Sequence, residues 1–331
     1  MLQRLRLVFD DFTLILLLVV VTATLMPAHG AGVGFFETLT ALAIALLFFM
    51  HGAKLSRHAI IAGVVHWRLH LLVFLFTFVA FPLIGWATIP VLEPLLGEAL
   101  TRGLIYLCVL PGTVQSAIAF TSLARGNVPA AICSASASSL IGILLTPLLM
   151  VWILDTQGVG ERFSAAEAAL KISAQLLLPF VAGHLSRPWL GAWVDRHRTW
   201  LGRVDQSSIL LIVYTAFSAS VVDGLWRMVS LSALATLSVV CCLLLALVLS
   251  ITTWLARSLG FPREDEITIV FCASKKSMAT GVPLAQILFS GSALGPALLP
   301  LMIFHQIQLM VCAVLASRYA HQRQASGIPV S

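Results

Sequence analysis

Charged residues are scarce in this chain. Of its 331 residues, 10% are charged and 59% are hydrophobic, whereas soluble globular proteins average about 25% charged residues. Such a chain has too little polar surface to cover itself in water, which excludes a soluble binding module. The composition therefore predicts an all-α polytopic membrane protein.

Catalytic motifs and metal-ligand spacings are also missing. The sequence has no Walker loop, no GxSxG and no HExxH, and its six cysteines all lie in apolar runs. Neither a zinc site nor a disulfide framework fits that cysteine spacing. We therefore expect no enzyme activity, no cofactor and no metal centre. The net charge of +6 does not indicate nucleic acid, because basic residues in membrane proteins mark cytoplasmic loops.

Stretches of about 20 apolar residues predict ten membrane spans. They cover approximately residues 11–28, 35–53, 69–90, 102–124, 128–153, 166–186, 206–224, 229–257, 265–289 and 294–318. The first stretch also resembles a signal peptide, because Arg4 and Arg6 precede it and the small-residue run "PAHGAG" follows it. We favour a retained span, because the repeat described below needs this helix.

The basic residues between the spans predict the orientation. With the N-terminus in the cytoplasm, fourteen Lys and Arg residues lie on the cytoplasmic side and four lie outside. The positive-inside rule then places both termini in the cytoplasm. A bacterial inner membrane is the simplest location for such a protein.

Two lysines, Lys275 and Lys276, fit neither the cytoplasmic nor the external side of the membrane. They lie in "FCASKKSMATG", with no acidic residue closer than Glu266. Residues 267–274 would form about 12 Å of helix and 278–290 about 20 Å, both short of a hydrocarbon core of roughly 30 Å. One crossing through both segments, about 36 Å long, would place the two ammonium groups near mid-membrane. A pair of re-entrant hairpins is the alternative.

A second interrupted span lies in the first half of the chain. Pro111 and Gly112 stand in the middle of an apolar run, and the polar residues Thr113, Gln115 and Ser116 follow. Proline removes a backbone donor and clashes with the preceding turn, so the helix should break or kink there. An ordinary proline-kinked helix is the simpler alternative.

The two interruptions predict an inverted repeat. Pro111 and Lys275 are 164 residues apart, and the glycine turns that follow, at Gly126 and Gly291, are 165 apart. Because each half has five spans, the halves would cross the membrane in opposite directions. Paired interrupted helices in inverted halves are typical of a secondary transporter's binding site. The predicted halves of the single unit 1–331 are residues 1–153 (spans 1–5) and 166–320 (spans 6–10).

Broken helices leave backbone groups that need ions, substrate or polar side chains as partners. The polar residues at the breaks and on span 5 are therefore the candidate substrate and ion ligands: Lys275, Lys276, Ser274, Ser277, Thr113, Gln115, Ser116, Ser134 and Ser138. Close helix packing explains the two serines of span 5 equally well. Asn127 is expected to cap the short turn between spans 4 and 5 rather than to bind a ligand. His305, which Gln306 and Gln308 follow, is a weaker site candidate.

Three runs resemble the bile acid:sodium symporter family, and within it the SBF-like branch. They are "FFMHGAKLSR", "AFTSLARGNVPAAICSASAS" and "FCASKKSMATGVPLAQILF", and the resemblance covers essentially the whole chain. It implies a panel domain of spans 1, 2, 6 and 7 against a core domain of spans 3–5 and 8–10. The broken spans 4 and 9 would cross in the core, and the activity would be transport of a small organic anion by alternating access.

The resemblance also implies sodium ligands that this chain lacks. Cys272 and Lys276 stand where sodium-coupled members have a glutamate and a glutamine, and Ala131 and Ala135 stand at hydroxyl positions. Thr77 stands where those members have a further glutamine. Because hard cations need oxygen ligands, these replacements argue against sodium binding at the family's sites. We hypothesise that one of the two lysines replaces sodium, so that transport is proton-coupled or uncoupled. The alternatives are a non-transporting regulator of cation homeostasis and a conventional sodium-coupled symporter.

Overall fold

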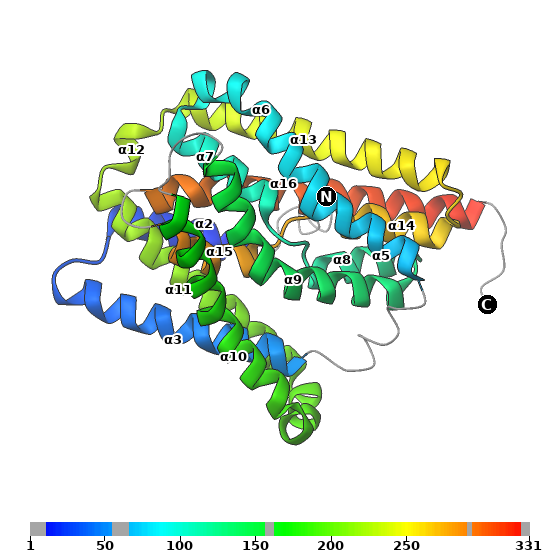
Figure 1. The fold of residues 1–331 in the computed structure, drawn as a ribbon, viewed down its shortest axis with the longest axis horizontal. Coiled ribbons are helices and arrows are strands. Elements are labelled where there is room, and N and C mark those ends of the chain that lie inside the picture. Colours follow the sequence, from blue (N-terminus) through cyan, green and yellow to red (C-terminus); the bar gives the residue numbers. More distant parts are fainter. Residues whose placement is uncertain (1–10, 55–65, 156–161, 290–292, 326–331) are drawn as a thin grey trace.

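The computed structural model describes residues 11–54, 66–155, 162–289 and 293–325. Helices account for all the regular structure in these residues, as the composition predicts (Figure 1). By length and composition, six helical segments can cross a membrane: Ala31–Lys54, Trp67–Leu96, Val128–Ile153, Arg198–Val222, Leu231–Ser258 and Leu294–Gln322. The count of ten spans stays a prediction.

The described residues form fourteen α-helices and one π-helical turn. Their bounds are α2 Asp11–Leu25, α3 Ala31–Lys54, α5 Trp67–Leu75, the π-helical turn η2 Phe76–Ala80, α6 Phe81–Leu96, α7 Glu98–Val109, α8 Gln115–Leu123, α9 Val128–Asp155, α10 Arg162–Arg196, α11 Arg198–Val222, α12 Leu225–Met228, α13 Leu231–Ser258, α14 Arg263–Ala273, α15 Met278–Leu288 and α16 Leu294–Ala325.

The helices α10 and α11 extend beyond the predicted spans 166–186 and 206–224. Their outer turns carry polar residues, among them Asp195 and Arg198. An apolar stretch marks the part of a helix that fits hydrocarbon, but a helix can continue into water. Hydropathy therefore underestimates the length of these two helices.

Two groups of helices lie side by side in the fold. The helix α3 packs along α10, and α11 packs against α2 and α3, while α16 packs against α7 and α13, and α13 packs against α14 (Figure 1). The contact of α3 with α10 depends on two glycines. A Cβ atom at Gly52 would overlap the carbonyl oxygen of Phe180, and one at Gly183 would overlap that of Phe49. Small residues of this kind let helix backbones touch inside a membrane.

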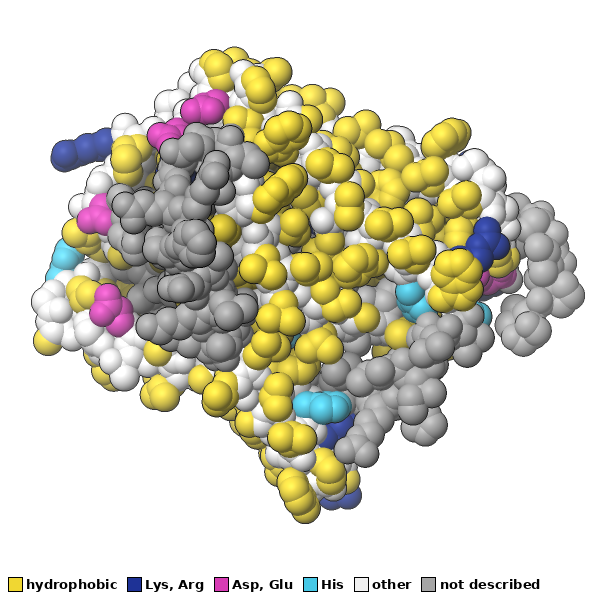
Figure 2. Space-filling view, in the orientation of Figure 1, with side chains coloured by type: hydrophobic (Ala, Val, Ile, Leu, Met, Phe, Trp, Pro, Cys, Tyr) yellow, Lys and Arg dark blue, Asp and Glu magenta, His cyan; other side chains and the backbone are white. Residues whose placement is uncertain are grey.

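Hydrophobic side chains cover the middle of the face in Figure 2, and charged side chains gather towards its ends. Many large apolar residues are exposed there and elsewhere, including Leu178 at 75% and Leu243 at 64%. Soluble proteins rarely expose apolar patches of this extent. Hydrocarbon is the environment in which such a surface is stable.

The π-helical turn η2 interrupts the long segment formed by α5 and α6. The N–H of Phe81 bonds the carbonyl oxygen of Phe76, five residues earlier. In the same register, the carbonyl oxygen of Thr77 would accept from the N–H of Pro82, but proline has no N–H. The Thr77 carbonyl is therefore left without a helical partner and is available to another group.

Two helices are broken where the sequence contains Pro111 and the lysine pair. The chain leaves the helix between Val109 and Gln115, and again between Ala273 and Met278. The two breaks touch each other, because the N–H of Ser277 donates to the carbonyl of Pro111 at 2.8 Å. A Cβ at Gly112 would lie 3.1 Å from the carbonyl oxygen of Cys272, so a larger residue would push the breaks apart.

Candidate substrate and ion site

Lys276 is the most completely bonded group at the meeting point of the breaks. Its side chain is fully buried, and its Nζ donates to the carbonyl oxygens of Thr77 at 3.0 Å, Cys108 at 2.7 Å and Leu110 at 2.7 Å. The ring of Phe81 lies 4.1 Å from the same nitrogen. An ammonium group has three N–H donors, so each one is used.

The Lys276 ammonium lies at the C-terminal end of the half-helix α7. The last carbonyls of a helix have no helical partner and carry partial negative charge. Lys276 binds two of these, and the carbonyl of Val109 between them accepts from Oγ1 of Thr146 at 2.9 Å. A buried cation at this position is thus stabilised by the helix end and satisfies its carbonyls in return.

Gln308 of α16 holds the backbone of Lys276 in place. Its Oε1 accepts from the N–H of Lys276 at 2.9 Å, and its Nε2 donates to the carbonyl of Lys276 at 3.0 Å. The Nε2 also lies 2.9 Å from Nδ1 of His305. Gln308 is fully buried and supplies the two partners that a continuous helix would have given Lys276.

Replacing Gln308 by methionine should lower the free energy of unfolding by about 2–4 kcal/mol. The substitution keeps the side-chain volume but leaves an N–H and a carbonyl buried without partners, each costing about 1–3 kcal/mol. Thermal unfolding of the purified protein in detergent measures the loss. Gln115→Met, the same change at an exposed position, should shift stability by less than about 0.5 kcal/mol. Equal effects of the two variants would contradict this role of Gln308.

Lys275 is also fully buried but has fewer partners than Lys276. Its Nζ donates to one carbonyl oxygen, that of Ser116, at 2.9 Å. It lies 3.8 Å from the ring centroid of Phe120 and 5.5 Å from that of Phe271. The two ammonium groups therefore point to different elements, Lys276 to α7 and η2 and Lys275 to α8.

The serines on either side of the lysines bond their own helices. The hydroxyl of Ser274 donates to the carbonyl of Val270 at 2.6 Å, at the end of α14. The hydroxyl of Ser277 accepts from the N–H of Thr280 at 3.2 Å and so caps α15. In this structure both predicted ligands stabilise the helix ends that form the break.

The structure separates the two serines of α9. Ser138 lies at the crossing, where its Oγ accepts from the N–H of Gly112 at 3.0 Å. Ser134 bonds Nδ1 of His70 on α5 at 2.6 Å. Ser138 thus belongs with the breaks, whereas Ser134 joins α9 to α5.

The remaining predicted ligands lie at the start of α8. The hydroxyls of Thr113 and Ser116 are 2.8 Å apart. Gln115 is exposed, and it is not among the hydrogen-bond partners of either lysine in the described residues. The interpretation of Asn127 as a cap is confirmed, since its Oδ1 accepts from the N–H of Ala130 at 3.1 Å.

The fold and the site together define a class of membrane protein. The helices are long and apolar, two of them are broken, and ammonium groups are buried where the breaks meet. Discontinuous helices that meet inside an apolar bundle are characteristic of secondary membrane transporters. The chain belongs to the SBF-like CPA transporter family, whose family model matches residues 10–321. It is an integral, multi-pass membrane protein of a transporter family.

Several proteins are similar to this chain over nearly its whole length. An uncharacterized protein of Pseudomonas aeruginosa is 60% identical over 97% of this chain and 96% of its own. The protein named "Putative symporter YfeH" of Escherichia coli is 58% identical over 96% of this chain and 95% of its own. Sodium/bile acid cotransporter 7-B of Xenopus laevis is 30% identical over 95% of this chain and 92% of its own.

Proposed function

We propose that this protein moves a small organic anion by alternating access, with the Lys276 ammonium in place of a sodium ion. The observation that carries the proposal is the set of three backbone carbonyls, from Thr77, Cys108 and Leu110, around one buried nitrogen. Backbone carbonyl oxygens are among the ligands that hard metal cations use in proteins. A lysine tethered at the break supplies the same positive charge without a bound ion.

The positions at which the family resemblance implies sodium ligands support this replacement. Thr77, in the position of a glutamine, offers its carbonyl to Lys276. Cys272, in the position of a glutamate, has its Sγ 4.0 Å from the carbonyl of Ala131. The carboxylate and amide oxygens that the resemblance implies for sodium are thus absent where this chain places a cation of its own. Because that cation cannot be released, transport would be proton-coupled through a lysine or uncoupled.

Lys275 is the residue that we propose for the anionic substrate. It donates to one carbonyl, although an ammonium has three donors. It reaches the first turn of α8, the end of a helix that favours negative charge. An anion entering beside the exposed Gln115 would complete the bonding of this lysine.

The same proposal includes the architecture of the transporter. The two breaks are each followed by a half-helix and a long helix, α8 and α9 in one case and α15 and α16 in the other, which supports two inverted halves of five spans. The packing of α3 on α10 and of α11 on α2 supports a separate panel domain. We place both termini in the cytoplasm of a bacterial cell and the protein in its inner membrane.

Uptake into proteoliposomes tests the proposal. Taurocholate, a steroid sulfate and succinate represent three classes of organic anion, and each is offered with and without an imposed pH gradient. We expect saturable uptake of at least one of them, competed by an excess of the same unlabelled anion. Failure to exchange any of the three would favour a non-transporting regulator.

A further inference from the structure

A groove with a volume of about 1060 Å³ runs between α13 and α16. The residues that line it do not include any of the predicted substrate or ion ligands. Its volume lies just above the range for small-molecule sites, about 300–1,000 Å³. The groove opens on the outer surface of the bundle, where Trp254 is 66% exposed and Val314 is 51% exposed.

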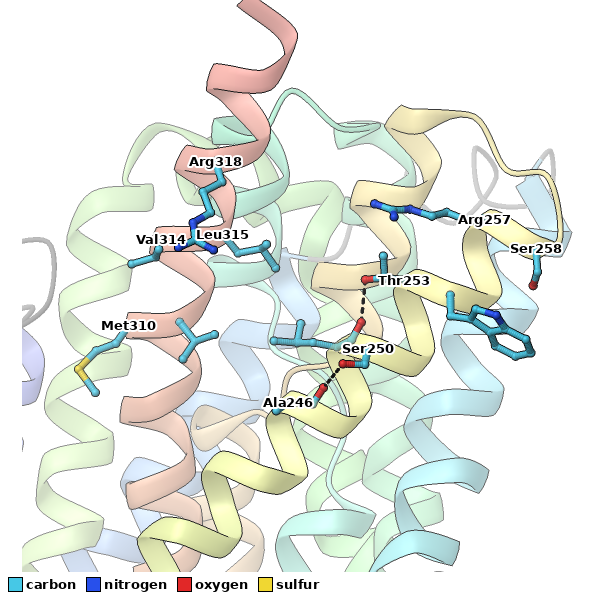
Figure 3. A pocket seen from close by; sticks show the side chains of 12 residues that line it. Ala246, Ser250, Thr253, Arg257, Ser258, Met310, Val314, Leu315 and Arg318 are labelled. Atoms are coloured by element: carbon cyan, nitrogen blue, oxygen red, sulfur yellow. Dashed lines mark hydrogen bonds between the residues drawn. The ribbon is translucent and has the colours of Figure 1, made fainter. Parts of the chain in front are cut away.

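The walls of the groove are apolar although α13 contributes two hydroxyl groups. Ser250 donates its hydroxyl hydrogen to the carbonyl of Ala246, and Thr253 donates to that of Leu249, both at 2.7 Å (Figure 3). Neither hydroxyl therefore has a hydrogen to donate to a ligand. Leu249 of α13 and Val314 of α16 line the groove with other aliphatic side chains. A hydrocarbon chain fits such walls, whereas a sugar or a peptide would leave its polar groups without partners.

One end of the groove is positively charged. Arg257 of α13 and Arg318 of α16 approach it from opposite sides (Figure 3), and none of the lining residues is acidic. Arg257 also bonds Glu266 through Nε and Nη2, at 3.1 and 3.0 Å. Within the part of the chain that the structure describes, the exposed side chain of Arg318 has no hydrogen bond or ion pair. Two guanidinium groups beside an apolar channel match a phosphate attached to a hydrocarbon chain.

We propose that this groove binds an anionic phospholipid, with an acyl chain along the walls and the phosphate between Arg257 and Arg318. The charged end lies where α13 finishes, at Ser258, which is where a spanning helix meets the lipid headgroups. Basic pockets between membrane helices recognise anionic headgroups, and an exposed tryptophan at the same level, Trp254, is typical of that interface. The bound lipid would link α13 to α16, beside the broken helix α14.

Native mass spectrometry of the full chain tests this site. The protein, purified in mild detergent, is mixed with phosphatidylglycerol or with phosphatidylcholine of the same acyl chains. We expect the wild type to retain one phosphatidylglycerol in preference to phosphatidylcholine. Arg318→Ala should weaken that retention about fivefold, the effect of removing one basic residue near a headgroup. Arg318 is chosen because Arg257 also bonds Glu266.

Two further variants separate the groove from general attraction to a basic surface. Arg203→Ala removes an exposed arginine of α11 that does not line the groove and should leave retention unchanged. Val314→Trp keeps every charge but fills the groove, and should reduce retention at least as much as Arg318→Ala. Equal retention of the two lipids by the wild type, equal effects of Arg203→Ala and Arg318→Ala, or full retention by Val314→Trp would each overturn the proposal.

Discussion

Replacing Lys276 by alanine is expected to lower the free energy of unfolding by about 3–5 kcal/mol. The substitution removes the Nζ that donates to the carbonyls of Thr77, Cys108 and Leu110. Each buried carbonyl left without a partner costs about 1–3 kcal/mol. The negative end of α7 also loses the charge that stabilises it.

Sodium distinguishes this explanation from a simple loss of packing. If the carbonyls form a cation site, sodium chloride should raise the melting temperature of Lys276→Ala more than choline chloride does. The wild type, which carries its own cation, should show no such difference. Lys276→Met keeps most of the side-chain volume and should be about as unstable as Lys276→Ala. A methionine variant as stable as the wild type would show that the carbonyls do not need a donor.

Replacing Lys275 by methionine is expected to reduce uptake strongly while the protein stays folded. The ammonium of Lys275 has one carbonyl partner, so its loss should cost about 1–2 kcal/mol of stability. An anion that pairs with it would lose a charged hydrogen bond worth about 1.5–3 kcal/mol, or roughly 10- to 150-fold in affinity.

Isothermal titration calorimetry of the transported anion with the wild type and with Lys275→Met gives the ratio of the two affinities directly. Lys275→Arg keeps the charge and should retain part of the affinity. Ser134→Ala, on α9, is a useful control because Ser134 bonds His70 rather than either lysine. Undiminished binding and uptake by Lys275→Met would remove this lysine from the substrate site.

The sequence was sufficient to find the helical class and the positions of both breaks. Pro111 cannot continue a helix hydrogen-bond ladder, and a lysine pair inside an apolar run needs partners that lipid does not offer. Both signals are local, so they can be read without knowledge of the packing. The family resemblance, carried by long runs around these breaks, is confirmed by the family match.

The partners of the lysines could not be predicted in the same way. The carbonyl of Thr77 becomes available through a π-helical turn that places Pro82 opposite it, and a backbone register of this kind has no clear sequence signal. Gln308 lies 32 residues from Lys276, and its role depends on how α16 packs on the break. His305, Gln306 and Gln308 lie together in one apolar span, and nothing in the sequence distinguishes Gln308 from the other two.

Uptake of the transported anion in sodium chloride and in choline chloride, for the wild type and for Lys276→Gln, tests the replacement of sodium most directly. A cation fixed in the protein makes external sodium unnecessary, so wild-type rates should be equal in the two salts. Lys276→Gln should lose most of its uptake in choline. Strictly sodium-dependent uptake by the wild type, unchanged in Lys276→Gln, would contradict the account.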